Sequence, residues 1–111
     1  MSDLIEIEWT SGSMDEARMV SRFLVQERLV ANAQIIPWIE SIYMLDNRLE
    51  TAQESKILYK TRRDKLEKVK EVILQNCKYE IPEIIFRTIE DGHGPFLRWL
   101  EDSTPDFSLP Q

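Results

Sequence analysis

The feature that most constrains the fold is a long strand-forming stretch that reverses on itself near the middle of the chain. Positions 33–45 are rich in β-branched and aromatic residues, and the pair Asp46-Asn47, which tolerates positive φ, follows them. Positions 48–60 have the pattern of a returning strand. Pro37 cannot donate to a strand ladder, so the first arm should be bulged there or lie at a sheet edge. The pattern predicts a long antiparallel hairpin.

Helices and further strands are predicted on both sides of this hairpin. Near the N-terminus, Ile5, Ile7 and Trp9 alternate with glutamates, which is typical of a strand with one buried face. A capping-box pattern at 13–16 opens a helix of about fifteen residues. The remaining elements are a second helix that opens with a capping-like pattern at 61–64 and stops near Asn76, and a strand over 84–89.

Pro95 suits the first turn of a third, short helix. Its apolar face should carry Phe96, Trp99 and Leu100, and we expect Trp99 to be a core residue. The tail that follows contains Phe107 and Leu109, and we expect it to dock as an extended strap.

The order β-α-β-β-α-β with an added helix predicts an α+β protein. It is the order of a ferredoxin-like split βαβ sandwich, here with a long central hairpin and an extra C-terminal helix. A chain of 111 residues can bury one core, so we expect a single domain over 1–111, with its core at about 3–103 and an extended tail at 104–111. The far end of the hairpin lacks its own apolar cover, and a neighbouring subunit is one way to supply it. One sheet face is also uncovered, and if that face is apolar, oligomerisation is the usual way to cover it.

Charge and cysteine content exclude several classes of protein. The net charge of −6 disfavours a general nucleic-acid binder, because such binding depends on neutralising phosphates. The longest uncharged stretch, 29–39, is far shorter than the roughly 20 residues of a membrane span. The single cysteine cannot form an intramolecular disulfide, and acidic residues near the start do not resemble a secretory signal. We therefore expect a cytoplasmic protein that contacts neither nucleic acid nor membrane.

Cys77 and His93 are the candidate ligands for a transition metal, because the chain has one thiol and one imidazole. Two such residues do not close a site, but a symmetric assembly can bring together copies from several chains. The alternatives are that Cys77 is a small apolar residue at a helix end and that His93, between two glycines, is an exposed loop residue.

Two other groups of residues have competing interpretations. Basic residues outnumber acidic ones over 56–78, which could form an anion site or a solvated face with ion pairs such as Asp64–Lys68 and Glu67–Lys70. Tyr79, Glu80 and Glu83 surround Pro82 and could transfer protons, or could be a polar loop beside a strand. No catalytic motif accompanies them, so we predict that the protein is not an enzyme.

The segment Lys78-Tyr79-Glu80-Ile81-Pro82-Glu83-Ile84-Ile85 resembles the signature of the CutA divalent-cation tolerance family, whose usual form is His-Pro-Tyr-Glu-Val-Pro-Glu-Ile. Other stretches that resemble the family follow in the family's order: Glu27-Arg28-Leu29-Val30-Ala31-Asn32, Ser41-Ile42-Tyr43, Lys60-Thr61-Arg62 and Phe96-Leu97-Arg98-Trp99-Leu100. The chain departs from the family pattern at Cys77, where the family usually has His, at Asn32, where it often has Cys, and at Leu45, where Trp is common; the turn has Asn47-Arg48 in place of Gly-Lys.

The resemblance implies a homotrimer whose hairpins extend to neighbouring subunits and which is associated with tolerance to copper and other divalent ions. We predict a trimeric, cytoplasmic, non-enzymatic protein that binds copper or another divalent metal through Cys77 and His93. One alternative is a trimeric small-ligand sensor resembling signalling proteins of the PII type, with Lys60, Tyr79, Glu80 and Glu83 as the binding residues of a cleft between subunits. The other is a scaffold that binds an unidentified protein partner without metal.

Overall fold

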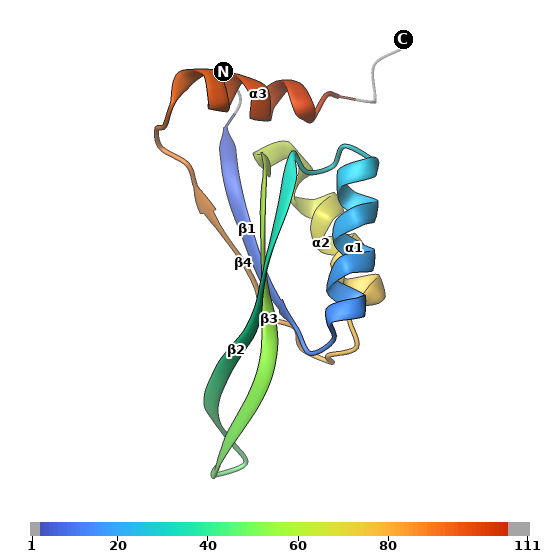
Figure 1. Cartoon of the computed structure of the whole chain (residues 1–111), viewed down its shortest axis with the longest axis vertical. Coiled ribbons are helices and arrows are strands. Elements are labelled where there is room, and N and C mark those ends of the chain that lie inside the picture. Colours follow the sequence, from blue (N-terminus) through green and yellow to red (C-terminus); the bar gives the residue numbers. More distant parts are fainter. Residues whose placement is uncertain (1–2, 107–111) are drawn as a thin grey trace.

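The computed structural model describes residues 3–106 and has the predicted order of elements (Figure 1). The elements are β1 (Leu4–Ser11), α1 (Met14–Gln26), β2 (Asn32–Leu45), β3 (Arg48–Arg62), a short 3-10 turn η1 (Arg63–Lys65), α2 (Leu66–Asn76), β4 (Ile84–Thr88) and α3 (Gly94–Ser103). None of these helices is long and apolar enough to cross a membrane.

The strands form one antiparallel sheet in the order β2-β3-β1-β4. Ile7 of β1 pairs with Tyr59 of β3 on one side and with Phe86 of β4 on the other. Figure 1 shows α1 and α2 together on one face of this sheet and α3 across its end. The architecture is the ferredoxin-like α+β fold that the sequence predicts, with the extra C-terminal helix.

The core lies between the sheet and the two helices. The alternation on β1 is confirmed, since Ile5, Ile7 and Trp9 are fully buried. They pack with Ile57 and Tyr59 of β3, Val20 and Leu24 of α1, and Val69 and Ile73 of α2. The indole Nε1 of Trp9 donates to Tyr59 Oη at 2.9 Å, and Ser21 Oγ lies 2.8 Å from the same oxygen, so these buried polar groups are satisfied. Burial raises the pKa of Tyr59 to about 12.

The helix boundaries follow local hydrogen bonding. The side chain of Ser13 accepts a hydrogen bond from the backbone N–H of Glu16 at 3.2 Å, which confirms the predicted start of α1. The helix has 13 residues rather than about fifteen, because Arg28 adopts positive φ (59°) and ends it. The second helix ends at Asn76, as predicted. Its predicted capping pattern at 61–64 is wrong, because β3 continues to Arg62 and no side chain caps η1.

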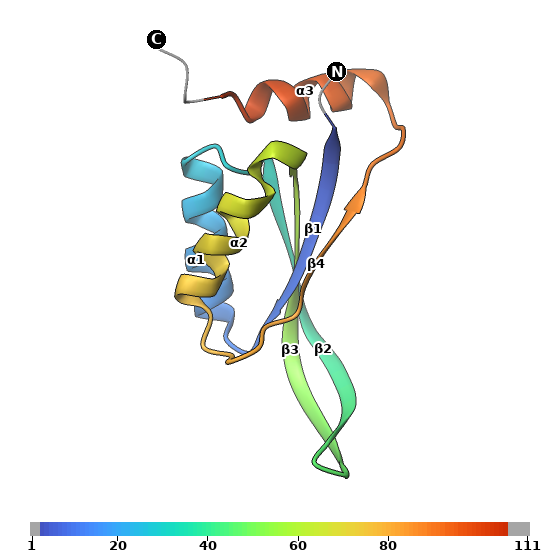
Figure 2. The ribbon, with the colours of Figure 1, turned by 180° about the vertical axis from the view of Figure 1, so that it is seen from behind.

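The hairpin of β2 and β3 projects beyond the helices (Figure 2). Asp46 and Asn47 have φ of 51° and 63°, so the turn is of the two-residue type that needs positive φ at both positions. The register shifts between Ile36 and Ile39, and β2 is an edge strand, so both expectations drawn from Pro37 are confirmed. Ile42, Met44 and Leu49 near the tip are 63–70% exposed, as expected for an arm without its own apolar cover.

The third helix packs differently from the prediction. Pro95 lies in its first turn, as expected. Leu97 and Leu100 are buried against Leu4 and Ala31, whereas Trp99 is 46% exposed. The expectation that Trp99 is a core residue is therefore wrong for the single chain. The helix turns Leu97 and Leu100 towards the core, so Phe96 and Trp99 on its other side are only partly covered.

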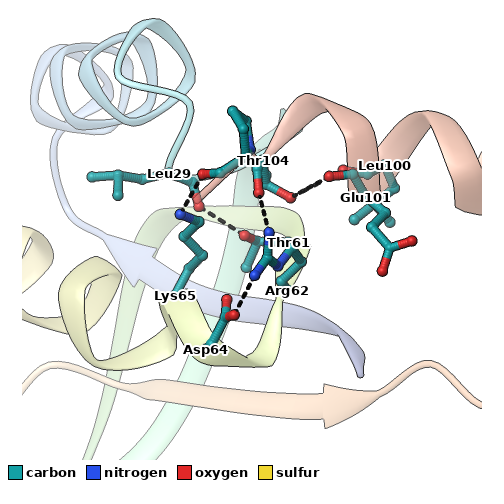
Figure 3. A network of polar contacts seen from close by, with 9 residues as sticks. Leu29, Thr61, Arg62, Asp64, Lys65, Leu100, Glu101 and Thr104 are labelled. Atoms are coloured by element: carbon teal, nitrogen blue, oxygen red, sulfur yellow. Dashed lines mark hydrogen bonds and ion pairs between the residues drawn. The ribbon is translucent and has the colours of Figure 1, made fainter. Parts of the chain in front are cut away.

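Polar contacts fix the C-terminal end of α3 to the junction of β3 and α2 (Figure 3). Arg62 Nη1 donates to the carbonyl of Thr104 at 2.8 Å and Nη2 pairs with Asp64, while Lys65 Nζ donates to the carbonyl of Pro105 at 2.7 Å. The start of the predicted strap is thus held in place. Phe107 and Leu109, on which the strap prediction rested, lie outside the described residues.

The sheet face opposite the helices carries ion pairs among half-exposed apolar side chains: Ile36 lies opposite Lys56, Ile85 lies opposite Glu8, and each isoleucine is 44% exposed. Lys56 Nζ lies 3.1 Å from Glu8 Oε2, Lys60 Nζ lies 3.2 Å from Glu6 Oε2, and Arg87 Nη2 lies 2.9 Å from Glu8 Oε1. Burial of Glu8 favours its neutral form, but the hydrogen bonds from Lys56 and Arg87 outweigh burial and lower its pKa. The face therefore neutralises much of its own charge, and exposed apolar surface is present both on this face and on the hairpin.

Candidate functional site

A groove separates the distal part of the hairpin from the loop that joins α2 to β4. Its volume is about 680 Å³, and it contains three of the predicted binding residues. The lining residues are Thr10, Ser41, Ile42, Tyr43, Leu45, Glu54, Tyr79, Glu80, Ile81 and Glu83. The structure thus brings Tyr79, Glu80 and Glu83 together with the hairpin, although Lys60 is not among the lining residues.

Tyr79 joins the loop to the hairpin. Its Oη donates to Glu54 Oε2 at 2.6 Å. Gly12 leaves room for the phenol, since a Cβ at position 12 would lie 2.6 Å from Tyr79 Oη. Burial and the neighbouring carboxylate of Glu54 raise the pKa of Tyr79 well above its usual value. The phenol therefore remains a hydrogen-bond donor at neutral pH.

The groove is acidic and supplies oxygen ligands. Glu54, Glu80 and Glu83 contribute carboxylates, and among the residues that the structure describes no lysine or arginine lines the groove. Such a lining suits a cation better than an anion, and carboxylate oxygens are the ligands of hard divalent ions. However, no group of three or more His, Cys, Asp or Glu side chains among residues 3–106 is placed to hold one metal ion. A single chain does not form a closed metal site from the part that the structure describes.

Cys77 caps the C-terminal end of α2, where it is half-buried. It lies beside Glu16, whose carboxylate accepts hydrogen bonds from Ser11 Oγ at 2.6 Å and from the backbone N–H of Lys78 at 3.0 Å. Burial raises the pKa of the Cys77 thiol, and the negative charge of Glu16 raises it further. Because the thiolate is the form that binds soft metals, the environment within one chain does not activate Cys77 as a ligand.

His93 lies far from Cys77 along the sheet. It is exposed and precedes α3 without making a side-chain capping bond. The loop after Cys77 leads into β4 beside Trp9, whereas the other end of β4 pairs with Ile5, and α3 crosses that end of the sheet (Figure 1). The two candidate metal ligands are not brought together in one chain.

Lys60 belongs to the charged sheet face. Its Nζ donates to Gln34 Oε1 at 2.7 Å and pairs with Glu6. Along β3 it is about 20 Å from Glu54, at about 3.3 Å per residue, so any cleft that combines Lys60 with Tyr79 has to involve a second subunit.

The basic residues over 56–78 mostly occur in ion pairs. Lys70 Nζ lies 3.2 Å from Glu67, as predicted, and Lys68 Nζ lies 3.6 Å from Glu71. Asp64 pairs with Arg62 rather than with Lys68. These pairs favour the solvated face over an anion site.

The sequence reasoning missed Gly12 and Glu54. Both lie against Tyr79 in the structure, although they are distant from it in the sequence. The signal that points to Glu54 is the register of the hairpin, which places it opposite Ile39, directly after the bulge at Pro37.

Comparison with known proteins assigns the chain to a family. Residues 5–103 match the model of a family described as CutA1 divalent ion tolerance protein. The chain belongs to this family. The residues that first suggested CutA, from Tyr79 to Glu83, form one wall of the groove. The family signature therefore lies at the groove rather than in the core.

Individual CutA proteins agree in sequence and in fold. The chain is 35% identical to the divalent-cation tolerance protein CutA of Thermus thermophilus over 86% of its own length and 92% of that protein's. The crystal structure of CutA1 from Oryza sativa superposes with a TM-score of 0.90 at 28% identity, covering 95% of this chain and 96% of that one. The chain is also 33% identical to the chloroplastic protein CutA of Arabidopsis thaliana over 86% of its own residues, but it spans only about half (52%) of that relative's length.

Proposed function

We propose that this CutA1-family protein acts in tolerance to divalent metal ions as a homotrimer that binds the ion, copper foremost, with ligands from more than one subunit. The observation that carries the proposal is the exposed apolar hairpin tip. Met44 and Leu49 are directly paired across the two strands and are 63% and 70% exposed. A neighbouring subunit would remove this apolar surface from water.

The placement of the metal donors supports a site shared between subunits. Cys77, His93 and the carboxylates of the groove are too dispersed to enclose an ion within residues 3–106. Association would add a second set of donors to each groove and would exclude water from it. A new charge near Cys77 would also act on its thiol, because a bound cation lowers the pKa of a nearby thiol.

Metal binding to the assembled, chelator-stripped protein tests the proposal. Equilibrium titration with Cu(I) and with Cu(II) should show saturable binding at a fixed ratio of ions to subunits. We expect Cys77→Ser and His93→Ala to weaken Cu(I) binding and Glu83→Gln to weaken Cu(II) binding. Glu90→Gln is a matched control, because Glu90 is exposed and is not among the groove residues.

The mass of the particle is measured in the same samples by light scattering. A mass near 13.1 kDa, the value for one chain, would contradict the trimer. Copper binding that is no stronger than to the unfolded chain would contradict the metal proposal, even if the trimer is present.

A second candidate is a small-ligand sensor of the PII type, which the groove favours by its size and by its mixture of polar and apolar residues. A sensor of an anionic ligand has less support, because Lys60 is already paired with Glu6 and the groove is acidic. Thermal stabilisation by a small ligand in metal-free protein would support this candidate. A scaffold role would instead predict a retained protein partner and no response to metal or ligand.

We also propose that the protein acts in the cytoplasm and does not catalyse a reaction. The lone, half-buried Cys77 suits a reducing compartment, and the phenol of Tyr79 is bound to Glu54 rather than to a nucleophile. Fractionation of cells that express the protein at its natural level tests the compartment.

A further inference from the structure

Trp38 has a backbone conformation that a bulky side chain rarely adopts. Its φ is 62°, and it lies in the bulge that follows Pro37 on β2. The other residues with positive φ have local reasons: Arg28 ends α1, and Asp46 and Asn47 form the hairpin turn. For a tryptophan this region is strained, because Cβ approaches the carbonyl oxygen.

The indole does not offset this strain by packing in the chain. Trp38 is 75% exposed, among the highest values for large hydrophobic residues between positions 3 and 106. A strained and exposed tryptophan contributes little to stability. Strained residues tend to occur at functional sites, where recognition of a ligand offsets their cost.

A cavity of about 430 Å³ adjoins Trp38 on the side of α1. Its lining comes from the β1–α1 turn, from α1, from the bulge and from β3: Gly12, Met14, Arg18, Pro37, Trp38, Gln53, Glu54 and Ser55. This volume is within the range of small-molecule sites. The cavity is distinct from the acidic groove, although Glu54 lines both.

The polar lining is balanced in charge. Arg18 is a cation and Glu54 an anion, while the amide of Gln53 and the hydroxyl of Ser55 can both donate and accept hydrogen bonds. One oxygen of Glu54 already accepts a hydrogen bond from Tyr79, and within residues 3–106 Ser55 Oγ makes one polar contact, a 3.9 Å approach to the sulfur of Met14. Glu54 would repel a bound anion, and Arg18 would repel a bound cation. A neutral ligand that carries several hydroxyl groups suits both.

We propose that this cavity binds the pyranose ring of a sugar. The apolar C–H face of the ring would lie on the indole of Trp38, and the hydroxyl groups at its edge would bond to Arg18, Gln53 and Ser55. A linear polyol lacks a flat apolar face to lie on the indole. A flat aromatic ligand has too few hydroxyl groups at its edge to bond to Arg18, Gln53 and Ser55 together. The site shares Glu54 with the acidic groove but uses no metal ion, and it goes beyond the function proposed above.

Titration of the assembled protein with simple sugars tests the proposal. The chain has three tryptophans, so the indole N–H signals in ¹H–¹⁵N spectra can be assigned with single variants. The probes are the methyl pyranosides of glucose, galactose and mannose, N-acetylglucosamine, and linear sorbitol as the control compound. We expect a saturable shift of the Trp38 signal with at least one pyranose, and no saturation with sorbitol.

Variants separate binding from folding. Trp38→Asn should fold at least as well as the parent, because asparagine tolerates positive φ, and should abolish the response seen in the backbone signals of the cavity. Gln53→Ala should weaken binding about fivefold, the loss expected for one neutral hydrogen bond. Trp99→Phe is the matched control, and it should leave binding unchanged because Trp99 is not among the cavity residues.

Three results would overturn the proposal. The first is the absence of saturation with every pyranose, and the second is unchanged binding in Trp38→Asn. The third is a smaller particle mass in Trp38→Asn, which would assign Trp38 to a contact between copies of the chain. A failure of copper binding has no bearing on any of these results.

Discussion

The phenol of Tyr79 occupies the space that a side chain at position 12 would need, and this makes Gly12→Ala informative. The added Cβ would lie 2.6 Å from Tyr79 Oη, so the phenol has to move and lose its hydrogen bond to Glu54. We expect the free energy of unfolding to fall by about 1 kcal/mol. The pKa of Tyr79 should fall towards its usual value, which ultraviolet titration of the phenols measures. Gly94→Ala is the control, because its nearest neighbour, Arg98, would be 3.5 Å away.

The raised pKa values of two tyrosines predict that the folded state becomes less stable at alkaline pH. The pKa of Tyr59 is raised to about 12 by burial, and that of Tyr79 is raised by burial and Glu54. A raised pKa stabilises the folded state below the unfolded value near 10, and this contribution is lost as pH rises towards the folded value. Between pH 10 and 12, ionisation of the buried Tyr59 should reduce the free energy of unfolding by up to about 1.4 kcal/mol per pH unit. The contribution of Tyr79 should be smaller, because this side chain is partly exposed and solvent screens its interactions.

Urea unfolding across this pH range measures the slope. Tyr79→Phe should make the slope of unfolding free energy against pH less steep, and it leaves the buried core unchanged because Tyr79 is not a core residue. An unchanged slope in that variant would show that Tyr79 does not contribute.

At the scale of elements, the docking of α3 depends on leucine rather than on tryptophan. Leu100 is fully buried, so Leu100→Ala should destabilise the chain by about 2–5 kcal/mol. Trp99 is 46% exposed, so within a single chain Trp99→Ala should cost much less than the 3–5 kcal/mol typical of a buried tryptophan. Denaturant unfolding of both variants at low protein concentration makes the comparison. An equal loss in the two variants would show that α3 packs through its aromatic side instead.

The sequence predicted those elements whose residues decide their own local structure. The alternation of Ile5, Ile7 and Trp9 identified a buried strand, and Ser13 identified a helix start, because each pattern acts within a few residues. The position of Pro37 identified both a bulge and an edge strand. Local patterns were sufficient for the order of elements and therefore for the fold.

What local patterns missed depends on the packing of distant segments. The residues from Thr61 onward were predicted to begin a helix, but Thr61 and Arg62 extend β3, which pairs with β1 as far as Leu4 opposite Arg62. The stripe on α3 did not reveal which half would face the sheet. In the candidate site, Tyr79 was predicted, but its partner Glu54 was not, because 25 positions separate the two residues and no local pattern connects them.

At the scale of the molecule, a group of ion pairs lies on the open sheet face, and the most distal part of the hairpin carries exposed apolar residues. The open sheet face pairs Glu6 and Glu8 with Lys56, Lys60 and Arg87. The hairpin carries exposed apolar residues and makes the chain elongated, at 51 × 28 × 20 Å. The radius of gyration is 15.2 Å, compared with about 13 Å for a compact chain of similar length. A subunit contact through the hairpin would use the part of the chain with the least internal packing.

This distribution predicts that assembly can be removed without unfolding the chain. Met44 and Leu49 pair across the hairpin, are largely exposed and do not line the acidic groove. The double variant Met44→Lys with Leu49→Lys should keep the circular dichroism of the parent, because neither side chain belongs to the core. Its mass by light scattering should fall to 13.1 kDa, because buried like charges would oppose association. Met19→Lys, at a 54% exposed position on α1, is the control for an added charge elsewhere and should leave the mass unchanged. An unchanged mass in the double variant would mean that the hairpin tip does not hold the subunits together.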